Sequence, residues 1–253
     1  MRNLRGIYVI WLRDVKRFWQ DRVRVVVGIA QPALYLFVLG NGLGGSFSLA
    51  GTPAAQGGFV RFMYPGIIGM TVLFTATFSA ISIVWDREFG FLKEVLVAPV
   101  SRSAIAIGKA LGGATQATLQ GAIILLLAPL AGVQITLLDV LILLPVMALV
   151  AFAMTSLGIA IAARMRSMES FQVVMNFFLM PMFFLSGAMF FTDRVPAWMK
   201  PLVSIDPLTY GVDALRGIVL GLNRFPLVQS VLILAGFATL ALGLAVRSFQ
   251  REG

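Results

Sequence analysis

Long stretches without any charged side chain are the feature that most limits what this chain can fold into. Six stretches, each longer than 20 residues, contain no Asp, Glu, Lys or Arg, and the 253-residue chain has no His. An α-helix needs about 20 apolar residues to cross the hydrocarbon core of a bilayer, which is about 30 Å thick. The pattern therefore predicts an all-α, polytopic membrane protein with six transmembrane helices. The charge-free stretches are residues 25–60, 62–85, 110–138, 140–163, 170–192 and 225–246.

The first stretch is longer than one span requires. Its second part, residues 46–58, is rich in Gly, Ser, Ala and Thr and contains Pro53, a composition typical of loops. We therefore expect a single span in this stretch, followed by a loop. The predicted transmembrane domain covers residues 25–246, with spans at about 25–43, 62–84, 106–130, 140–162, 170–191 and 226–246.

Basic residues are distributed unevenly between the two sides that six spans create. With a cytoplasmic N-terminus, 15 of the 20 Lys and Arg residues fall in cytoplasmic segments. Lys and Arg are enriched in the cytoplasmic loops of membrane proteins, so the asymmetry predicts a cell-membrane protein with both termini in the cytoplasm. The net charge of +9 then lies mainly at the membrane surface, and we expect no nucleic-acid partner.

Composition and motifs exclude most enzyme chemistry. The chain contains neither Cys nor His, which removes cysteine nucleophiles, the usual zinc sites and Ser-His-Asp triads. Ionisable residues, which mark proton relays and ion pathways, are missing from the interiors of the predicted spans. Gly108-Lys109 is not part of a phosphate-binding loop, because Ala110 follows it and the upstream glycine is missing. We predict no catalytic residue, cofactor site or metal site in this chain.

Residues 1–24 carry an amphipathic pattern ahead of the first span. Lys and Arg lie mainly on faces other than the apolar one, and this arrangement is typical of a helix in the cytoplasmic membrane interface. The helix is either a basic anchor that fixes topology or an elbow that also contacts a cytoplasmic partner. The apolar residues that recur at helical spacing are Leu4, Tyr8, Trp11, Val15 and Phe18.

Residues 85–103, between the second and third predicted spans, mix charged and apolar side chains on the cytoplasmic side. Glu88, Leu92 and Val95 follow helical spacing, and Pro99 ends the pattern. A short amphipathic helix of this kind suits docking on another protein. The alternative is a solvated loop whose apolar residues dip into the lipid interface.

Residues 192–225 form an external segment that is too short to cross the membrane twice. Asp206 is a good helix N-cap and Pro207 a good first helical residue. Apolar residues then recur at helical spacing, and Asp213 and Arg216 can pair on the opposite face. We expect an interfacial or re-entrant helix, which is either part of a gate or a lid with a packing role.

Two motifs resemble signatures of the permease subunits of type-2 ABC exporters, and the likeness covers the whole chain. Arg87-Glu88-Phe89-Gly90 with Leu96-Val97-Ala98-Pro99-Val100-Ser101-Arg102 is similar to the family's Arg-Glu-x-Gly … Leu-x-x-Pro-x-Ser-Arg loop. Asp206-Pro207-Leu208-Thr209-Tyr210 with Asp213-Ala214-Leu215-Arg216-Gly217 resembles the Asn-Pro-x-Thr-Tyr … Asp-x-Leu-Arg-Gly signature of the daunorubicin-resistance-like branch. Asp206 replaces the common Asn, and Gly90-Phe91-Leu92-Lys93-Glu94 replaces the frequent Gly-Thr-Leu-Glu.

The resemblance implies a permease that does no covalent chemistry. Two copies would pair around a central pathway, and two copies of a separate ABC ATPase, which binds ATP and Mg²⁺, would dock from the cytoplasm. By this resemblance the residues that couple to the ATPase are Arg87, Glu88, Gly90, Leu92, Glu94, Leu96, Pro99 and Arg102. Those of the external gate are Asp206, Pro207, Tyr210, Asp213 and Arg216.

Aromatic and Met side chains without fixed charge occur in the predicted spans, for instance Phe74, Phe78, Met175 and Phe178. As a pathway surface they favour export of an amphipathic drug- or lipid-like molecule, whereas as a structural surface they pack helices or face lipid. Within the family, the alternative substrate is a lipid-linked glycan or polysaccharide. From a different class, the alternative is an ATP-independent membrane channel or scaffold.

Overall fold

A computed structural model describes residues 2–40, 42, 58–88, 101–192 and 195–250. Within these ranges the chain forms helices joined by turns and contains no β-strand, which confirms the all-α prediction for the described part. The elements are α1 (Arg2–Gln20), α2 (Arg22–Leu34), the π-helical η1 (Tyr35–Leu39), α4 (Phe59–Ser79), α5 (Ile81–Glu88), α7 (Arg102–Leu125), the 3₁₀ turn η3 (Pro129–Ala131), α8 (Leu137–Ala162), α9 (Met168–Leu185), α10 (Lys200–Ile205), α11 (Pro207–Leu220) and α12 (Leu227–Gln250).

Four helical units in the described residues are long and apolar enough to cross a membrane. They are α4 with α5 as one unit, α8, α9 and α12. The pair α1 and α2, bent by 67°, makes a fifth if it is counted as one broken span. α7 occupies the place of the third predicted span, but Lys109, Gln116 and Gln120 lower its apolar character. The chain is therefore a multi-pass helical membrane protein, and the count of six spans stays a prediction.

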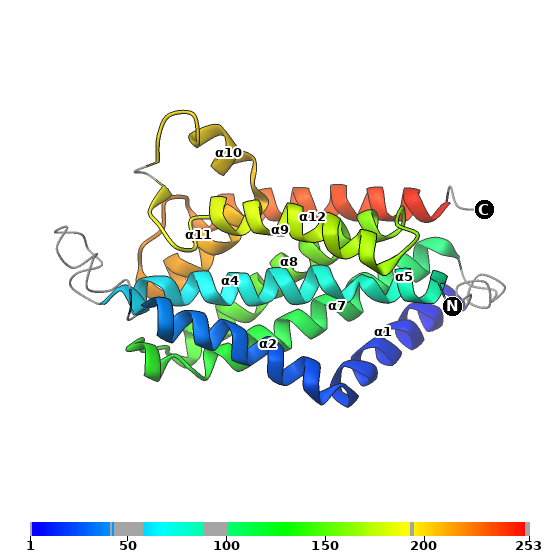
Figure 1. Ribbon diagram of the computed structural model, residues 1–253, viewed down its shortest axis with the longest axis horizontal. Coiled ribbons are helices and arrows are strands. Elements are labelled where there is room, and N and C mark those ends of the chain that lie inside the picture. Colours follow the sequence, from blue (N-terminus) through cyan, green and yellow to red (C-terminus); the bar gives the residue numbers. More distant parts are fainter. Residues whose placement is uncertain (1, 41, 43–57, 89–100, 193–194, 251–253) are drawn as a thin grey trace.

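α4 lies at the centre of the bundle, where α2, α7, α8, α9 and α11 all contact it (Figure 1). Small residues allow the close approach of these helices. A Cβ atom added to Gly158 of α8 would lie 2.8 Å from the backbone oxygen of Thr77 in α4. A Cβ added to Gly121 of α7 would lie 2.4 Å from the Met147 side chain. Both distances are shorter than real Cβ contacts. A larger side chain at Gly158 would push the helices apart because it meets backbone, whereas at Gly121 the flexible end of Met147 would have to move.

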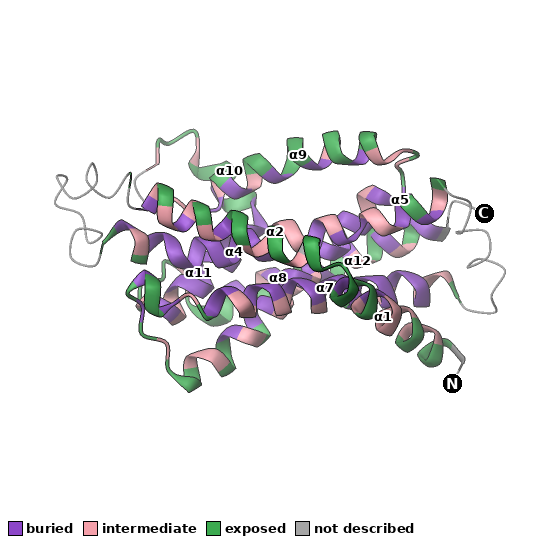
Figure 2. Ribbon diagram, turned by 60° about the horizontal axis from the view of Figure 1, so that its bottom comes forward, coloured by how far each residue is buried: buried purple, intermediate pink, exposed green. Residues whose placement is uncertain are grey.

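α9 differs from the central helices because most of its surface faces outward (Figure 2). Its buried residues, Phe171, Met175, Leu179 and Phe183, are spaced four apart and form one narrow stripe. Phe177 and Phe184 on its other faces are 76% and 50% exposed. An apolar surface of this extent needs lipid or another protein around it. The exposure of α9 therefore fits a helix at the edge of a membrane bundle.

The two ends of the bundle hold different segments (Figure 1). The starts of α1 and α7 and the ends of α5, α8 and α12 lie at one end, which we call the α5 end. The start of α4 and helices α10 and α11 lie at the other, the α11 end. This arrangement brings the beginning and the end of the described chain to the same side, as both-termini-cytoplasmic topology requires.

Single-cysteine labelling tests which end faces the cytoplasm. The chain contains no Cys, so Arg166→Cys at the α5 end and Ser204→Cys at the α11 end each introduce one thiol at an exposed position. An impermeant maleimide applied to intact cells should label Ser204→Cys alone, and both variants should react after the membrane is permeabilised. Labelling of Arg166→Cys in intact cells contradicts the predicted orientation.

Candidate functional site

α1 packs against α7 along a seam of small residues. A Cβ atom added to Gly108 would lie 3.0 Å from Cβ of Ile10, and one added to Gly112 would lie 3.0 Å from Cβ of Asp14. Two glycines four residues apart leave room for a second helix to approach closely. The indole N–H of Trp11 donates a hydrogen bond of 3.0 Å across the seam to the hydroxyl of Thr115. The Gly108/Gly112 pair is therefore a helix contact.

The seam changes which face of α1 is buried. Phe18 of the predicted apolar face is buried, but Leu4 and Tyr8 of the same face are 72% and 57% exposed. The carboxylate residue Asp14 is buried in their place, because it faces Gly112. A helix does cover Arg2–Gln20, but its buried side includes a charged group that the apolar pattern does not predict, and its place in the membrane interface stays a prediction.

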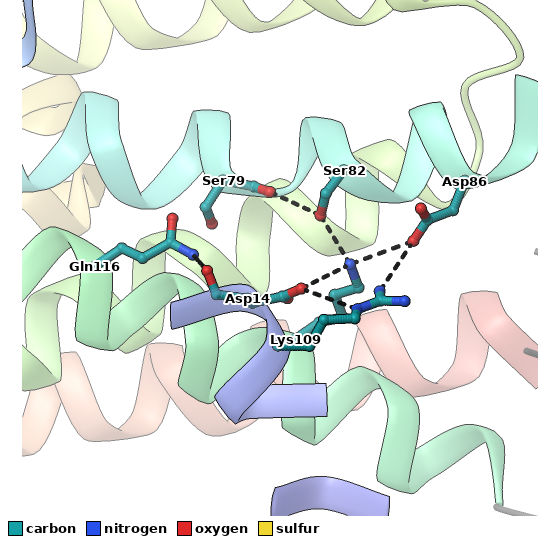
Figure 3. A network of polar contacts seen from close by, with 7 residues as sticks. Asp14, Ser79, Ser82, Asp86, Lys109 and Gln116 are labelled. Carbon is teal, nitrogen blue, oxygen red and sulfur yellow. Dashed lines mark hydrogen bonds and ion pairs between the residues drawn. The ribbon is translucent and has the colours of Figure 1, made fainter. Parts of the chain in front are cut away.

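A buried charge cluster, made of Arg13, Asp14, Asp86 and Lys109, joins α1, α5 and α7 (Figure 3). The Lys109 ammonium nitrogen lies 3.4 Å from Asp14 Oδ1 and 3.4 Å from Asp86 Oδ2. It also donates to the Ser82 hydroxyl over 2.9 Å. The Arg13 guanidinium lies 3.4 Å from Asp86 Oδ2 and 3.7 Å from Asp14 Oδ1. Two positive and two negative groups thus balance within the cluster.

Burial makes this balance necessary. Lys109, Asp14 and Asp86 are each at most 9% exposed, and moving an unpaired charge out of water costs several kcal/mol. The charge pattern counts Lys109 among the cytoplasmic basic residues, whereas in the structure its side chain is buried between helices. Lys109 lies within the predicted span 106–130 beside Gly108 and Gly112. A lysine at the contact point of two helices is the signal that would have indicated a buried partner.

Two predicted coupling residues, Arg87 and Glu88, bind the ends of other helices. The Arg87 guanidinium donates to the backbone oxygens of Met165 over 2.5 Å and Ala163 over 2.8 Å, at the C-terminal end of α8. Glu88 Oε2 accepts a hydrogen bond of 3.3 Å from the backbone N–H of Met168, the first residue of α9. In both cases the sign of the charge matches the helix dipole, positive at a C-terminus and negative at an N-terminus.

Arg102 repeats this arrangement on the other side of the segment. Its guanidinium donates to the backbone oxygen of Phe249, near the C-terminal end of α12, over 3.4 Å. Ser101 caps α7, because its hydroxyl accepts a hydrogen bond of 3.2 Å from the Ala104 N–H. Both described ends of residues 85–103, the predicted coupling segment, are therefore hydrogen-bonded to the bundle. The remaining predicted coupling residues, Gly90, Leu92, Glu94, Leu96 and Pro99, lie outside the described residues.

The predicted external helix is α11, and its first turn is built as the sequence indicates. Asp206 caps it: Oδ1 accepts a hydrogen bond of 2.9 Å from the Leu208 N–H, and Pro207 is the first helical residue. Tyr210 donates from its hydroxyl to the Ser204 backbone oxygen over 2.9 Å. Asp206 is 5% exposed, and this burial raises the pKa of its carboxyl to about 7.

Asp213 and Arg216 each bind backbone groups of another segment, where the sequence suggests that they pair with each other. The Asp213 carboxylate accepts hydrogen bonds of 2.9 Å from the N–H groups of Arg224 and Phe225, just before α12. The Arg216 guanidinium donates to the Gly187 backbone oxygen over 2.7 Å, just after α9. It also lies 4.4 Å from the centre of the Phe62 ring in α4. α11 thus holds the ends of three other helices.

The predicted pathway residues do not share one environment. The rings of Phe74 and Phe78 are stacked with centroids 6.3 Å apart and are partly buried against the core. Met175 is fully buried, whereas Phe178 is 49% exposed on the outer surface of α9. Met175 therefore packs within this chain, and Phe178 faces away from it.

Comparison with known proteins gives one consistent family. Residues 5–220 match the model of the family described as ABC-2 type transporter. Nodulation protein J of Rhizobium leguminosarum bv. trifolii is 30% identical over 215 residues, which cover 84% of this chain and 80% of that protein. Inner membrane transport permease YadH of Escherichia coli (strain K12) is 26% identical over 239 residues, which cover 90% of this chain and 88% of that protein.

Removing the central cation of the buried charge cluster should destabilise the fold. Lys109→Met leaves the Asp14 and Asp86 carboxylates without their shared partner, and breaking a buried ion pair costs about 3–5 kcal/mol. Arg13→Met is the control, because the Arg13 side chain is 40% exposed and such pairs contribute up to about 1 kcal/mol. Denaturant unfolding in detergent, followed by tryptophan fluorescence, measures both. Equal stability of Lys109→Met and the wild type contradicts the assignment.

The cap of α11 should make stability depend on pH. Because folding raises the pKa of Asp206 to about 7, the folded state binds this proton more tightly than the unfolded state. Its contribution is fully present below about pH 4 and is lost as the pH rises to about 7. Asp206→Asn keeps a capping oxygen without a titratable group. Subtracting its thermal midpoints from those of the wild type between pH 4 and 8 isolates this effect, and a pH-independent difference contradicts it.

Proposed function

This chain belongs to the ABC-2 type transporter family, and we propose that it is the permease subunit of an exporter driven by a separate ABC ATPase. Its apolar helices and its transport-permease relatives make it a membrane transport subunit. The sequence contains no phosphate-binding loop, His or Cys, which supports leaving ATP, Mg²⁺ and hydrolysis to the partner. The chain then contributes the pathway and the machinery that responds to the ATPase.

The observation that carries this proposal is that the residues on both sides of residues 89–100 form hydrogen bonds with other helices. Arg87 and Glu88 on one side bind α8 and α9, and Arg102 on the other binds α12. Asp86, next to Arg87, is joined through Lys109 to Asp14 of α1. An ATPase that pushes on this segment would therefore move four further helices at once. A segment that only connected two spans would not need these links.

Coupling then follows from differential binding of two arrangements. The ATPase subunits would close when ATP binds, and the permease would shift because one of its arrangements fits the closed ATPases better. In our proposal Leu92 and Leu96 pack into a cleft of the ATPase, Glu94 and Glu88 supply polar contacts, and Gly90 and Pro99 delimit the docking element. α1 supplies a second contact, since it shares the buried charge cluster with α5 and α7.

We further propose six spans with both termini in the cytoplasm, two permease copies and two ATPase copies. The six charge-free stretches and the arrangement of the two bundle ends support the topology. The outward apolar faces of α9 and of α2, where Val23 and Val26 are 74% and 62% exposed, leave surface for a second permease copy as well as for lipid.

The proposed cargo is an amphipathic drug- or lipid-like molecule. The aromatic residues that support it are the partly buried Phe74 and Phe78 of α4 and, in a separate environment, the outward-facing Phe178 of α9. Aromatic surface without fixed charge suits an apolar tail better than a small hydrophilic ion. A lipid-linked glycan carries such a tail as well, and transport of defined cargoes in vesicles separates the two. Met175 is excluded from the lining of a single copy because it is fully buried.

Variants of the coupling segment test the proposed function. Glu88→Gln keeps an oxygen for the Met168 N–H but removes the charge, and Leu92→Asp places a charge in the proposed apolar contact. Loss of a charged hydrogen bond costs about 1.5–3 kcal/mol, which weakens docking about tenfold or more. Membrane insertion should survive, while copurification of the ATPase, ATP hydrolysis and export in proteoliposomes all fall.

Glu169→Arg is the matched control, because Glu169 lies in the first turn of α9 at the same end of the bundle but outside the segment. It disturbs the start of α9 by charge reversal without changing residues 85–103. If Glu88→Gln and Leu92→Asp retain normal ATP hydrolysis and export, the segment is only a connector. If Glu169→Arg reduces both as strongly as they do, disturbance of α9 explains the loss instead.

A further inference from the structure

A cavity of about 170 Å³ lies beside the buried charge cluster, between α1, the α4–α5 unit and α7. Its lining comes from the last turns of α1, from the junction of α4 with α5, and from the middle of α7. The cavity adjoins the 67° bend between α1 and α2. Asp14 belongs to both the cluster and the cavity, and Ser82, which also lines the cavity, accepts the hydrogen bond from Lys109.

The floor of the cavity carries hydrogen-bond acceptors. Gln116 is 6% exposed; its amide nitrogen donates to the Asp14 backbone oxygen over 3.0 Å, whereas Oε1 has no donor among the described residues. Ser79 and Gln116 face the same gap between α4 and α7 (Figure 3). The Ser79 hydroxyl donates to the Ala76 backbone oxygen over 2.6 Å, so its oxygen is left to accept. Together with the Asp14 carboxylate, the floor calls for a ligand that donates several hydrogen bonds.

The opening of the cavity has a different character. Arg17 is exposed, and its guanidinium lies 5.8 Å from the centre of the Trp85 ring. Trp85 is 41% exposed, and the neighbouring Trp19 is 53% exposed. Tryptophan with exposed Arg is typical of the headgroup level of a membrane. A ligand that enters here meets the exposed Arg17 and Asp21 first and buried acceptors last.

We propose that this cavity binds the headgroup of an ethanolamine phospholipid. In this headgroup the phosphate is next to the glycerol and the primary ammonium is at the tip. The phosphate would therefore lie near Arg17 at the opening, and the ammonium would reach the floor. Gln116 Oε1 and the Ser79 hydroxyl can accept two of its N–H groups, and the third can reach the Asp14 carboxylate, which it then shares with Lys109 and Arg13. The Trp85 ring, at the wall, suits the passage of a cation.

The same geometry discriminates against choline lipids. A choline headgroup has the same phosphate but carries three methyl groups instead of three N–H donors, so it leaves Gln116 Oε1 unsatisfied. Leaving a buried acceptor without a partner is costly, and a hydrogen bond to a charged donor contributes enough to change affinity about tenfold. Binding does not depend on the ATPase, so it can be tested on the permease alone.

Native mass spectrometry of the purified permease in detergent measures the binding of individual lipids. The wild type should bind a palmitoyl-oleoyl phosphatidylethanolamine about tenfold more tightly than the phosphatidylcholine with the same acyl chains. N-methyl and N,N-dimethyl phosphatidylethanolamine should fall between them in order, because each methyl removes one donor. This series needs no variant, so it remains decisive if substitutions in the cavity unfold the protein. Equal affinities across the series overturn the proposal.

Variants then locate the site. Gln116→Leu should abolish the preference for ethanolamine while leaving phosphatidylcholine binding unchanged, and Arg17→Gln should weaken both lipids alike. Gln134→Leu is the matched control, because Gln134 is exposed near the start of α8 and does not line this cavity. A preference that survives in Gln116→Leu places the lipid elsewhere and contradicts the assignment.

A last arm separates a lipid from a soluble amine with the same headgroup chemistry. Glycerophosphoethanolamine, which lacks acyl chains, should compete with phosphatidylethanolamine only at concentrations far above those of the lipid, because it lacks the apolar contacts of the acyl chains. Saturation of the site by this soluble compound at lipid-like concentrations identifies the ligand as a free amine and overturns the lipid assignment.

Discussion

The bridge that the Lys109 ammonium forms between Asp14 and Asp86 fixes the geometry of the whole α5 end. Ionised groups that are hidden from water must find partners of opposite charge, so the three helices that carry them have one common arrangement. Gly108 and Gly112 make the bridge possible, because only a seam without side chains lets Asp14 approach α7. The sequence therefore determines this arrangement in two ways: it supplies the charges that must be paired, and it supplies the glycines that let the two helices come close enough to pair them.

At the same end of the bundle, other charged side chains form hydrogen bonds that link both ends of the predicted coupling segment to neighbouring helices. Arg87 and Arg102 bind carbonyl groups at the C-terminal ends of α8 and α12, and Glu88 binds the N-terminus of α9. Each of these hydrogen bonds links one end of the segment to another helix, so in our proposal a displacement of the segment would reach those helices.

Sequence alone predicts the helical class, the positions of the apolar helices and the cap at Asp206, because each depends on residues close together in the chain. It does not predict the cluster, since Asp14, Asp86 and Lys109 are separated by long intervals and only the packing of α1 on α7 unites them. The apolar face assigned to α1 fails at Leu4 and Tyr8 for the same reason. Asp213 and Arg216 give a second example. Their helical spacing allows them to pair with each other, but in the structure both side chains form hydrogen bonds with backbone groups of other segments.

The two ends of the bundle use charge in different ways, and the difference bears on movement. At the α11 end Asp206, Asp213 and Arg216 bind backbone groups, so each interaction is tied to one loop or helix end. At the α5 end Lys109 is equidistant, at 3.4 Å, from carboxylates on two different helices. A cation held between two anions can shift toward either one as the helices move, without becoming unpaired at any point. If an ATPase acts at the α5 end, as we propose, the Lys109 bridge keeps its charges paired while the helices around it shift.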